Sequence, residues 1–237
     1  MSEPEADEGR DRPPGGWRIA LGALLLAGFA SAWFALAGRI DWIEGWAFLI
    51  LFTGFSTGLG LWLRRRNPGL LAERQGPPAA NVEPWDRTLV RWHTIGIVVL
   101  LVVAALDAGR YEWSRVPLAA QTVAWAALAG SCGVIWHVFA VNAFLSAYAR
   151  IQDDRGQRVV AGGLYGVVRH PMYAAVIVWA VALPVALGSL WAVLPGVLSA
   201  GLLVVRTARE DRMLIGRLAG YREYASRVRF RLLPGVW

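Results

Sequence analysis

Residues 118–141 read LAAQTVAWAALAGSCGVIWHVFAV, a run of 24 residues without a single Asp, Glu, Lys or Arg. A helix of this length rises about 36 Å, at about 1.5 Å per residue, and the hydrocarbon core of a bilayer is about 30 Å thick. We therefore predict a membrane-spanning helix here. Of all 237 residues, 56% are hydrophobic and only 17% are charged, which excludes an ordinary soluble domain. The chain is predicted to be an all-α, polytopic membrane protein.

Five further apolar stretches lie on either side of this run. They are Trp17–Ala37, Trp42–Leu63 and Leu89–Leu106 before it, and Met172–Leu187 and Leu190–Val205 after it. The last two have only 16 residues each, so we expect a tilted or incompletely spanning hairpin that turns at Gly188-Ser189. Pro184 and Pro195 are expected to kink this hairpin. The prediction is a transmembrane helical bundle of about six spans with a short C-terminal helical hairpin.

The arginine positions predict the topology. All 24 basic residues are arginine, and 21 of them lie in the N-terminal tail, the 64–91 loop, the 150–169 loop and the segment from residue 206 onward. Because cytoplasmic loops carry the excess of arginine, we expect both termini and both long loops in the cytoplasm, as in a bacterial inner membrane. The arginines flank apolar segments and form no single soluble patch, so they predict contact with anionic lipid headgroups and not with nucleic acid.

The remaining features concern domain organisation and metal binding. Residues 1–16 are polar, acidic and rich in Pro and Gly, which predicts a disordered cytoplasmic tail. Residues 17–237 form a single predicted membrane domain, with residues 17–63 as a candidate accessory helix pair. The single cysteine allows no disulfide within one chain. No metal site is expected, because Asp153 and Asp154 have no histidine at ligand spacing and the following Gly156 favours a turn.

The segment 150–173, RIQDDRGQRVVAGGLYGVVRHPMY, holds the first half of a candidate site. Pro171 suits the first turn of a helix, because its missing N–H has no partner to lose there. Arg169 and His170 would then lie beside free backbone amides with a positive partial charge, which predicts a site for a carboxylate or a phosphate. The glycine pair at 162–163 removes side chains where a ligand can approach the backbone. A cytoplasmic ligand pocket is expected at this point.

The predicted hairpin supplies the second half of the site. If the fifth helix leaves the cytoplasmic face and the sixth returns to it, Glu210 and Asp211 come near His170. Two carboxylates then lie opposite an anion site, so a ligand with both charges is expected. S-adenosylmethionine carries a carboxylate, an ammonium and a sulfonium, and the sulfonium would be attracted to the aromatic faces of the same segment.

Short motifs follow one another in a fixed order through this region. They are Gly163-Leu164-Tyr165, Arg169-His170-Pro171-Met172-Tyr173, Glu210-Asp211 with Leu214, then Tyr221, Tyr224 and Pro234. This order resembles the G-P-Y…R-H-P-x-Y…E-E-x-x-L…Y-x-x-Y…P pattern of the isoprenylcysteine carboxyl methyltransferase family and its phospholipid methyltransferase relatives. The resemblance covers about residues 142–234, which we treat as a methyltransferase-like cofactor region. It departs from the pattern at Leu164, Ala175 and Asp211.

The resemblance implies a membrane methyltransferase that binds S-adenosylmethionine through the R-H-P-x-Y loop and the acidic pair. The resemblance assigns cofactor binding to Arg169, His170, Tyr173 and Glu210. The full set of cofactor-binding candidates adds Gly163, Tyr165, Pro171, Asp211 and Asn142. No catalytic residue is assigned, because a carboxylate acceptor needs no strong base and nothing in the sequence selects one for an amine.

Simpler explanations exist for several of these residues. Arg169 could contact a lipid headgroup, and the acidic pair could form a solvated face that pairs with Arg206. We leave His93 and His137 outside the site, because a neutral histidine bonded to a neighbouring helix is common within membrane spans. The 64–91 loop could cover the entrance for the acceptor or serve as a structural cap.

The predicted function is methyl transfer to a lipid-like or prenylated acceptor, as carboxylate O-methylation or amine N-methylation. One alternative is an NADPH-dependent membrane enzyme similar to sterol reductases, although the Gly-rich dinucleotide fingerprint is missing. The other is a non-enzymatic transport or assembly protein, which the nearly charge-free spans disfavour. The sequence leaves the acceptor and the oligomeric state open.

Overall fold

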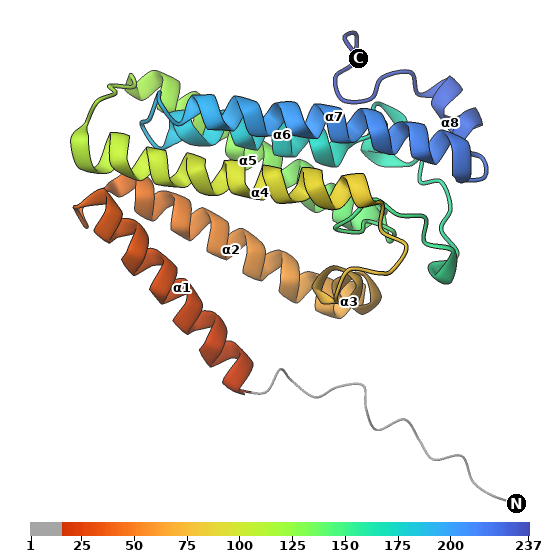
Figure 1. The fold of residues 1–237 in the computed structure, drawn as a ribbon, viewed down its shortest axis with the longest axis horizontal. Coiled ribbons are helices and arrows are strands. Elements are labelled where there is room, and N and C mark those ends of the chain that lie inside the picture. The colour runs from red at the N-terminus through yellow and green to blue at the C-terminus, as the bar shows by residue number, and fades with distance from the viewer. Residues whose placement is uncertain (1–15) are drawn as a thin grey trace, which may run out of the picture.

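The computed structural model describes residues 16–237, with side chains from residue 20 onward, and this part of the chain is all-helical. Its eight α-helices are α1 (Gly16–Ala37), α2 (Ile43–Arg66), α3 (Pro68–Gln75), α4 (Pro84–Ala104), α5 (Leu118–Val141), α6 (Pro171–Ala186), α7 (Val193–Arg217) and α8 (Tyr221–Arg227) (Figure 1). A π-helical segment, η1 (Ala105–Tyr111), continues α4. Two 3₁₀ turns, η2 (Asp153–Arg155) and η3 (Gly163–Gly166), lie between α5 and α6. The all-α prediction is confirmed, while the tail predicted over residues 1–16 falls, apart from Gly16, outside the described residues.

Four of these helices are long and apolar enough to cross a membrane, namely α1 from Ala20 onward, α2, α4 with η1, and α5. Together they make the chain an integral membrane protein. Helix α6 is apolar but has only 16 residues, and α7 is apolar only in its first half. The six predicted stretches therefore all form helices, but the count of six spans stays a prediction.

Helices α6 and α7 form the predicted hairpin. Its turn lies at Gly188, which has φ +85°, and the N–H of Ser189 donates to the carbonyl of Pro184 at 2.9 Å. The two helices approach closely at Gly196, where an added Cβ would overlap the carbonyl oxygen of Ala180. The second half of α7 consequently returns to the end of the bundle at which α6 begins (Figure 1).

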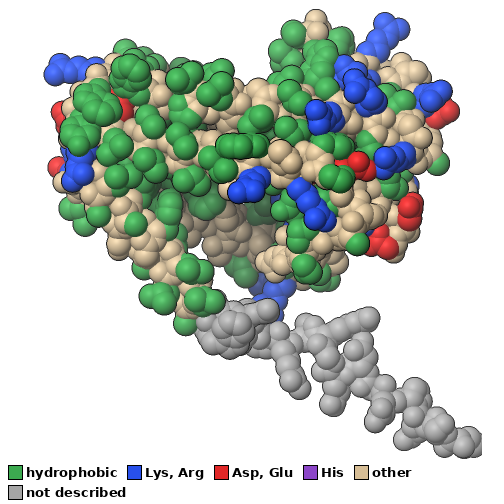
Figure 2. Space-filling view, in the orientation of Figure 1, with side chains coloured by type: hydrophobic (Ala, Val, Ile, Leu, Met, Phe, Trp, Pro, Cys, Tyr) green, Lys and Arg blue, Asp and Glu red, His purple; other side chains and the backbone are tan. Residues whose placement is uncertain are grey.

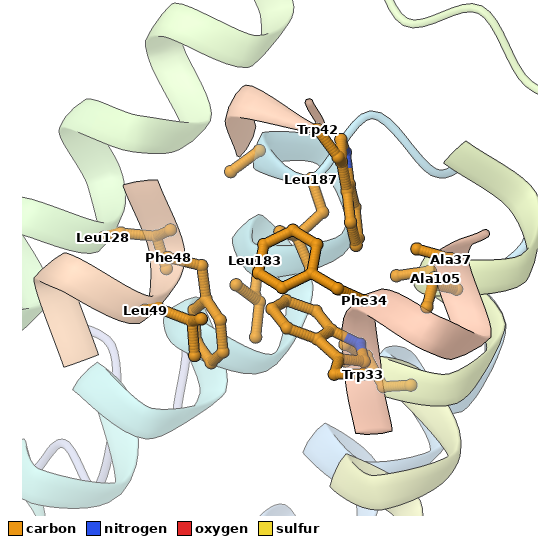
Figure 3. Packing of buried hydrophobic residues seen from close by; sticks show 14 of the residues in the cluster. Trp33, Phe34, Ala37, Trp42, Phe48, Leu49, Ala105, Leu128, Leu183 and Leu187 are labelled. Carbon is orange, nitrogen blue, oxygen red and sulfur yellow. The ribbon is translucent and has the colours of Figure 1, made fainter. Parts of the chain in front are cut away.

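A cluster of buried aromatic and aliphatic side chains joins α1 and α2 to the remaining helices. Trp33 and Trp42 lie with ring centroids 5.0 Å apart, close to Phe48 and to Leu183 of α6 (Figure 3). The indole N–H of Trp33 donates to the carbonyl of Leu101 in α4 at 3.0 Å. Residues 20–29 of α1 are exposed, so this helix is attached through its C-terminal half. The accessory-pair prediction for residues 17–63 remains a prediction.

The two ends of the bundle are both polar but differ in charge. At one end, Asp107 of η1 is fully buried and accepts hydrogen bonds from Ser114 and from Ser189 of the hairpin turn. The other end collects α3, α8 and the connections around η2 and η3. Figure 2 shows hydrophobic side chains over the middle of the molecule and most of the visible arginines at this second end. The cytoplasmic orientation of that end stays a prediction.

Candidate functional site

A cavity of about 250 Å³ lies at the arginine-rich end of the bundle. Its walls come from α3, α4, the segment after α5, the η3 turn, the beginning of α6, the second half of α7 and α8. This volume is close to the lower end of the range found for small-molecule sites. Six of the nine predicted residues border the cavity, namely Asn142, Tyr165, Arg169, His170, Tyr173 and Glu210.

Asp211 lies behind the cavity wall and is fully buried. Its carboxylate accepts two hydrogen bonds from Arg169, at 2.8 and 2.9 Å, one from Arg231 at 2.8 Å and one from Tyr221 at 3.1 Å. Nε2 of His170 is 3.3 Å from the same carboxylate. Burial alone would raise the pKa of Asp211, but the hydrogen bonds from His170, Arg231 and Arg169 outweigh it and hold that pKa well below its usual range. Asp211 is thus an ionised anchor for the wall.

The loop before α6 is fastened to the C-terminal segment of the chain. Nη1 of Arg169 donates to three backbone carbonyls between residues 225 and 229, at 2.9–3.3 Å. The backbone N–H groups of Arg169 and His170 donate to the carbonyls of Phe230 and Arg231, both at 2.9 Å. Most N–H groups of the Arg169 guanidinium therefore donate to acceptors within the protein. This side chain chiefly stabilises the cavity wall that it borders.

Glu210 and Asp211 face different directions, because consecutive residues of an α-helix point about 100° apart. Glu210 borders the cavity, where the hydroxyl of Tyr173 donates to its carboxylate. One turn earlier, the guanidinium of Arg206 lies 5.0 Å from the centroid of the Tyr173 ring and binds the buried Asp86 at 2.6 and 2.9 Å. Asp86 thereby balances the charge of Arg206. Among the described residues, Glu210 forms no ion pair of its own.

Neutral aromatic groups form much of the remaining wall. The amide of Asn142 donates to the hydroxyl of Tyr165 at 2.7 Å, and the hydroxyl of Tyr224 donates to the backbone carbonyl of Tyr165 at 2.7 Å. Burial raises the pKa of Tyr165, partly offset by the hydrogen bond from Asn142, and burial also raises the pKa of Tyr224 to about 12. The rings of His170 and Tyr173 stack, with centroids 5.7 Å apart. Both Tyr165 and Tyr224 are therefore uncharged at neutral pH.

Gly163 and Pro171, the other two predicted residues, shape the wall from outside it. Gly163 has φ +59°, and an added Cβ would overlap the ring of His137. Nε2 of His137 lies 3.4 Å from the backbone nitrogen of Leu164, so a helix of the bundle supports the η3 turn. Pro171 occupies the first turn of α6 as predicted and is buried. Both residues position the segment that carries Tyr165.

Some cavity residues could not be found from the sequence. The predicted site does not include His93, but this residue borders the cavity, with Nδ1 2.8 Å from the hydroxyl of Ser199. Arg74 reaches the cavity from α3, within the loop that we expected either to cover an entrance or to act as a cap. Neither residue stands in a motif with chemical meaning. Only the folded arrangement brings them to residues 142–224.

The predicted turn around Asp153 and Asp154 is present. It consists of η2 followed by Gly156 at φ +59°. Asp154 forms an ion pair with Arg150 at 2.7 Å. Arg150 is itself buried and also binds Glu73 of α3 at 2.9 Å. This network fixes the connection after α5 to α3.

The fold and the cavity together define a helical membrane protein with a partly polar cavity at one end of its bundle. Residues 120–216 match the model of the isoprenylcysteine carboxyl methyltransferase (ICMT) family. The match spans nearly all of α5, the connection that holds η2 and η3, α6 and nearly all of α7, so it confirms the resemblance of the C-terminal region to that family. The match supports the interpretation of this chain as a membrane methyltransferase. A comparison with curated proteins gives no match.

Proposed function

We propose that the chain is an S-adenosylmethionine-dependent methyltransferase that acts on a lipid-like or prenylated acceptor, at a carboxylate or an amine. The observation that carries this proposal is a carboxylate without an ion-pair partner among the described residues, Glu210, in a cavity whose wall also holds cationic, aromatic and aliphatic side chains. The cavity is built mainly from the range that matches a methyltransferase family. We further propose that this end of the bundle faces the cytoplasm, where the cofactor is made.

The donor set of the cavity suits the charges of this cofactor. Glu210 would hold its ammonium group, and His170 with the amides at the start of α6 would hold its carboxylate. The faces of Tyr165 and Tyr173 would favour the sulfonium. Asn142 would fix Tyr165 through the hydrogen bond between them. When bound, the cofactor supplies an electrophilic methyl group.

The protein's own contribution is positioning and exclusion of water. The buried contacts of Asp211 with Arg169 and Arg231 keep the wall rigid, so binding groups are held in place before a ligand arrives. The uncharged tyrosines and the apolar residues of the wall remove water from around a nucleophile. No general base is assigned.

A second depression supports a lipid-like acceptor. It has a volume of about 410 Å³ and lies between α5, α6 and the C-terminal segment. Apolar residues form nearly all of its lining, including Val134, Val178 and Leu232. Pro171 borders it and directly follows His170 of the cavity. An apolar chain in this groove would place its head group near the cavity.

The test is calorimetric titration of the purified protein in detergent with S-adenosylhomocysteine. Glu210→Gln and His170→Ala should each weaken binding by at least about tenfold, roughly 1.4 kcal/mol, the expected loss for one charge-assisted contact. Asp153→Asn is the control, because Asp153 is exposed and lies outside the cavity. A parent protein that does not bind, or two folded variants that bind like the parent, would refute the proposal.

A further inference from the structure

Helix α3 is firmly attached beside the cavity although it belongs to a surface connection. The side chain of Asn67 caps its first turn by accepting from the N–H of Leu70 at 3.0 Å, and Leu70 is fully buried. Glu73 accepts hydrogen bonds from Ser146 at 2.9 Å and from Arg150 at 2.9 and 3.1 Å. The position of the next residue, Arg74, is therefore fixed relative to the cavity wall.

Arg74 has an unusual environment for a partly buried arginine. Its guanidinium lies 4.9 Å from the centroid of the Phe139 ring, and Nη1 donates to the carbonyl of Leu145 at 3.2 Å. No carboxylate within residues 16–237 forms an ion pair with it. Burial lowers the pKa of Arg74, and the nearby positive charge of Arg206 lowers it further. The cavity wall thus holds an arginine whose charge is not balanced.

Three other arginines at this end, whose side chains are largely buried, contrast with it. Arg150, Arg169 and Arg206 each bind a carboxylate, supplied by Glu73, Asp211 and Asp86 respectively. Removing an arginine charge from water is unfavourable unless an anion compensates it. A planar guanidinium with free N–H groups is also the side chain best suited to bind a carboxylate through two hydrogen bonds. We therefore expect a ligand to supply the anion that compensates the charge of Arg74.

We propose that Arg74 binds the carboxylate of a small molecule held in this cavity, and that α3 thereby takes part in ligand recognition. This inference rests on the function proposed above, because it assigns a ligand group within the same cavity. Arg74 precedes residue 120, so the contact lies outside the range that matches the methyltransferase family. The carboxylate has two possible sources, the amino-acid end of the cofactor and an acidic acceptor.

The experiment measures binding to the full chain in detergent by calorimetry, with two matched pairs of probes. S-adenosylhomocysteine is compared with 5′-methylthioadenosine, which lacks the amino-acid end. A prenylated cysteine with a free carboxylate is compared with its carboxamide. The variants are Arg74→Ala and Arg74→Lys, and the control is Arg87→Ala, which removes an exposed arginine at the same end of the bundle.

Arg74→Ala should weaken one carboxylate probe at least about tenfold while its neutral counterpart changes less than about twofold. Arg74→Lys should recover part of that loss, and Arg87→Ala should bind like the parent. A loss confined to S-adenosylhomocysteine assigns the contact to the cofactor, and a loss confined to the prenylated acid assigns it to the acceptor.

The inference is overturned if folded Arg74→Ala binds both carboxylate probes like the parent, or if charged and neutral probes weaken equally. A parent protein that binds S-adenosylhomocysteine while Arg74→Ala shows no selective loss refutes only the role of Arg74. A parent that binds no carboxylate probe refutes the proposed function as well.

Discussion

Replacing Asp211 by asparagine should lower the stability of the fold around the site, and not only the affinity for a ligand. The substitution keeps the shape of the side chain but removes the charge that faces Arg169 and Arg231. One carboxylate oxygen also becomes an amide nitrogen, whose N–H groups face the N–H groups of a guanidinium. Arg169, which these contacts hold in place, also binds backbone carbonyls of residues 225–229, so the destabilisation should spread to the segment around residues 228–231.

The size of the stability loss in Asp211→Asn depends on how deeply Arg169 and Arg231 are buried. Removing one member of a buried ion pair costs about 3–5 kcal/mol, because the other charge stays buried without a partner. The side chain of Arg169 is 6% exposed, whereas that of Arg231 is 31% exposed and can turn to water. We therefore expect the lower limit, about 3 kcal/mol, which for a chain of this size corresponds to a Tm lower by about 6–12 °C.

The assay is thermal unfolding of the purified protein in detergent, together with amide hydrogen exchange. Exchange should become faster at Arg169 and His170, whose N–H groups donate to carbonyls of the C-terminal segment. Glu210→Gln is the matched control, because Glu210 is the adjacent carboxylate but, in the described part of the chain, only Tyr173 donates to it. It should lose affinity for S-adenosylhomocysteine with a Tm within about 2 °C of the parent. If Asp211→Asn instead keeps its Tm and exchange rates while losing that affinity, Asp211 is a ligand and not an anchor.

Four further outcomes are expected. Because the folded pKa of Asp211 is depressed, its stabilisation is complete above its unfolded pKa of about 4, so the Tm gap between parent and Asp211→Asn should narrow only below that pH. Gly163→Ala should cost about 1–3 kcal/mol in unfolding free energy, from its positive φ and the overlap with a histidine ring, measured by urea or thermal unfolding. Asp107→Ala should lower stability by about 2–3 kcal/mol, because it leaves buried donors unpaired, yet calorimetry should give an unchanged affinity for S-adenosylhomocysteine at the opposite end. Reporter fusions should place residue 156 in the cytoplasm and residue 112 on the other side of the membrane.

The fold was largely predictable because the bilayer requires long apolar helices, and these are visible as runs of sequence. The hairpin turn at Gly188-Ser189 and the proline at the start of α6 were predicted from local chemistry in the same way. The prediction ended the last apolar stretch at Val205, where the arginines begin, but α7 continues to Arg217. Its charged half is stabilised by contacts with Asp86 and with the loop before α6, and distant partners of this kind leave no periodic signal.

The sequence predicts which residues gather at the site, but not which of them face the cavity and which support its wall. The ordered motifs identified both Glu210 and Asp211, and only the packing of α7 shows that one borders the cavity while the other is buried behind it. Arg169 looked like a ligand-binding residue because it lies beside a helix start, yet its guanidinium mainly contacts Asp211 and backbone carbonyls. A sequence reveals which residue types are present, but the partner that each one takes depends on the tertiary structure.

The charges left facing the cavity describe the ligand better than any single motif does. Asp211 and Asp86 compensate Arg169 and Arg206, so these four groups contribute little net charge to the interior. Glu210 and Arg74 remain without an ion pair among the described residues, and the exposed Arg158 adds a further positive charge at the cavity wall. A cavity that presents both a negative and a positive group would favour a zwitterion over a neutral molecule. The amino-acid end of S-adenosylmethionine is a zwitterion, and this balance is the physical reason to measure Glu210 and Arg74 variants with the same probes.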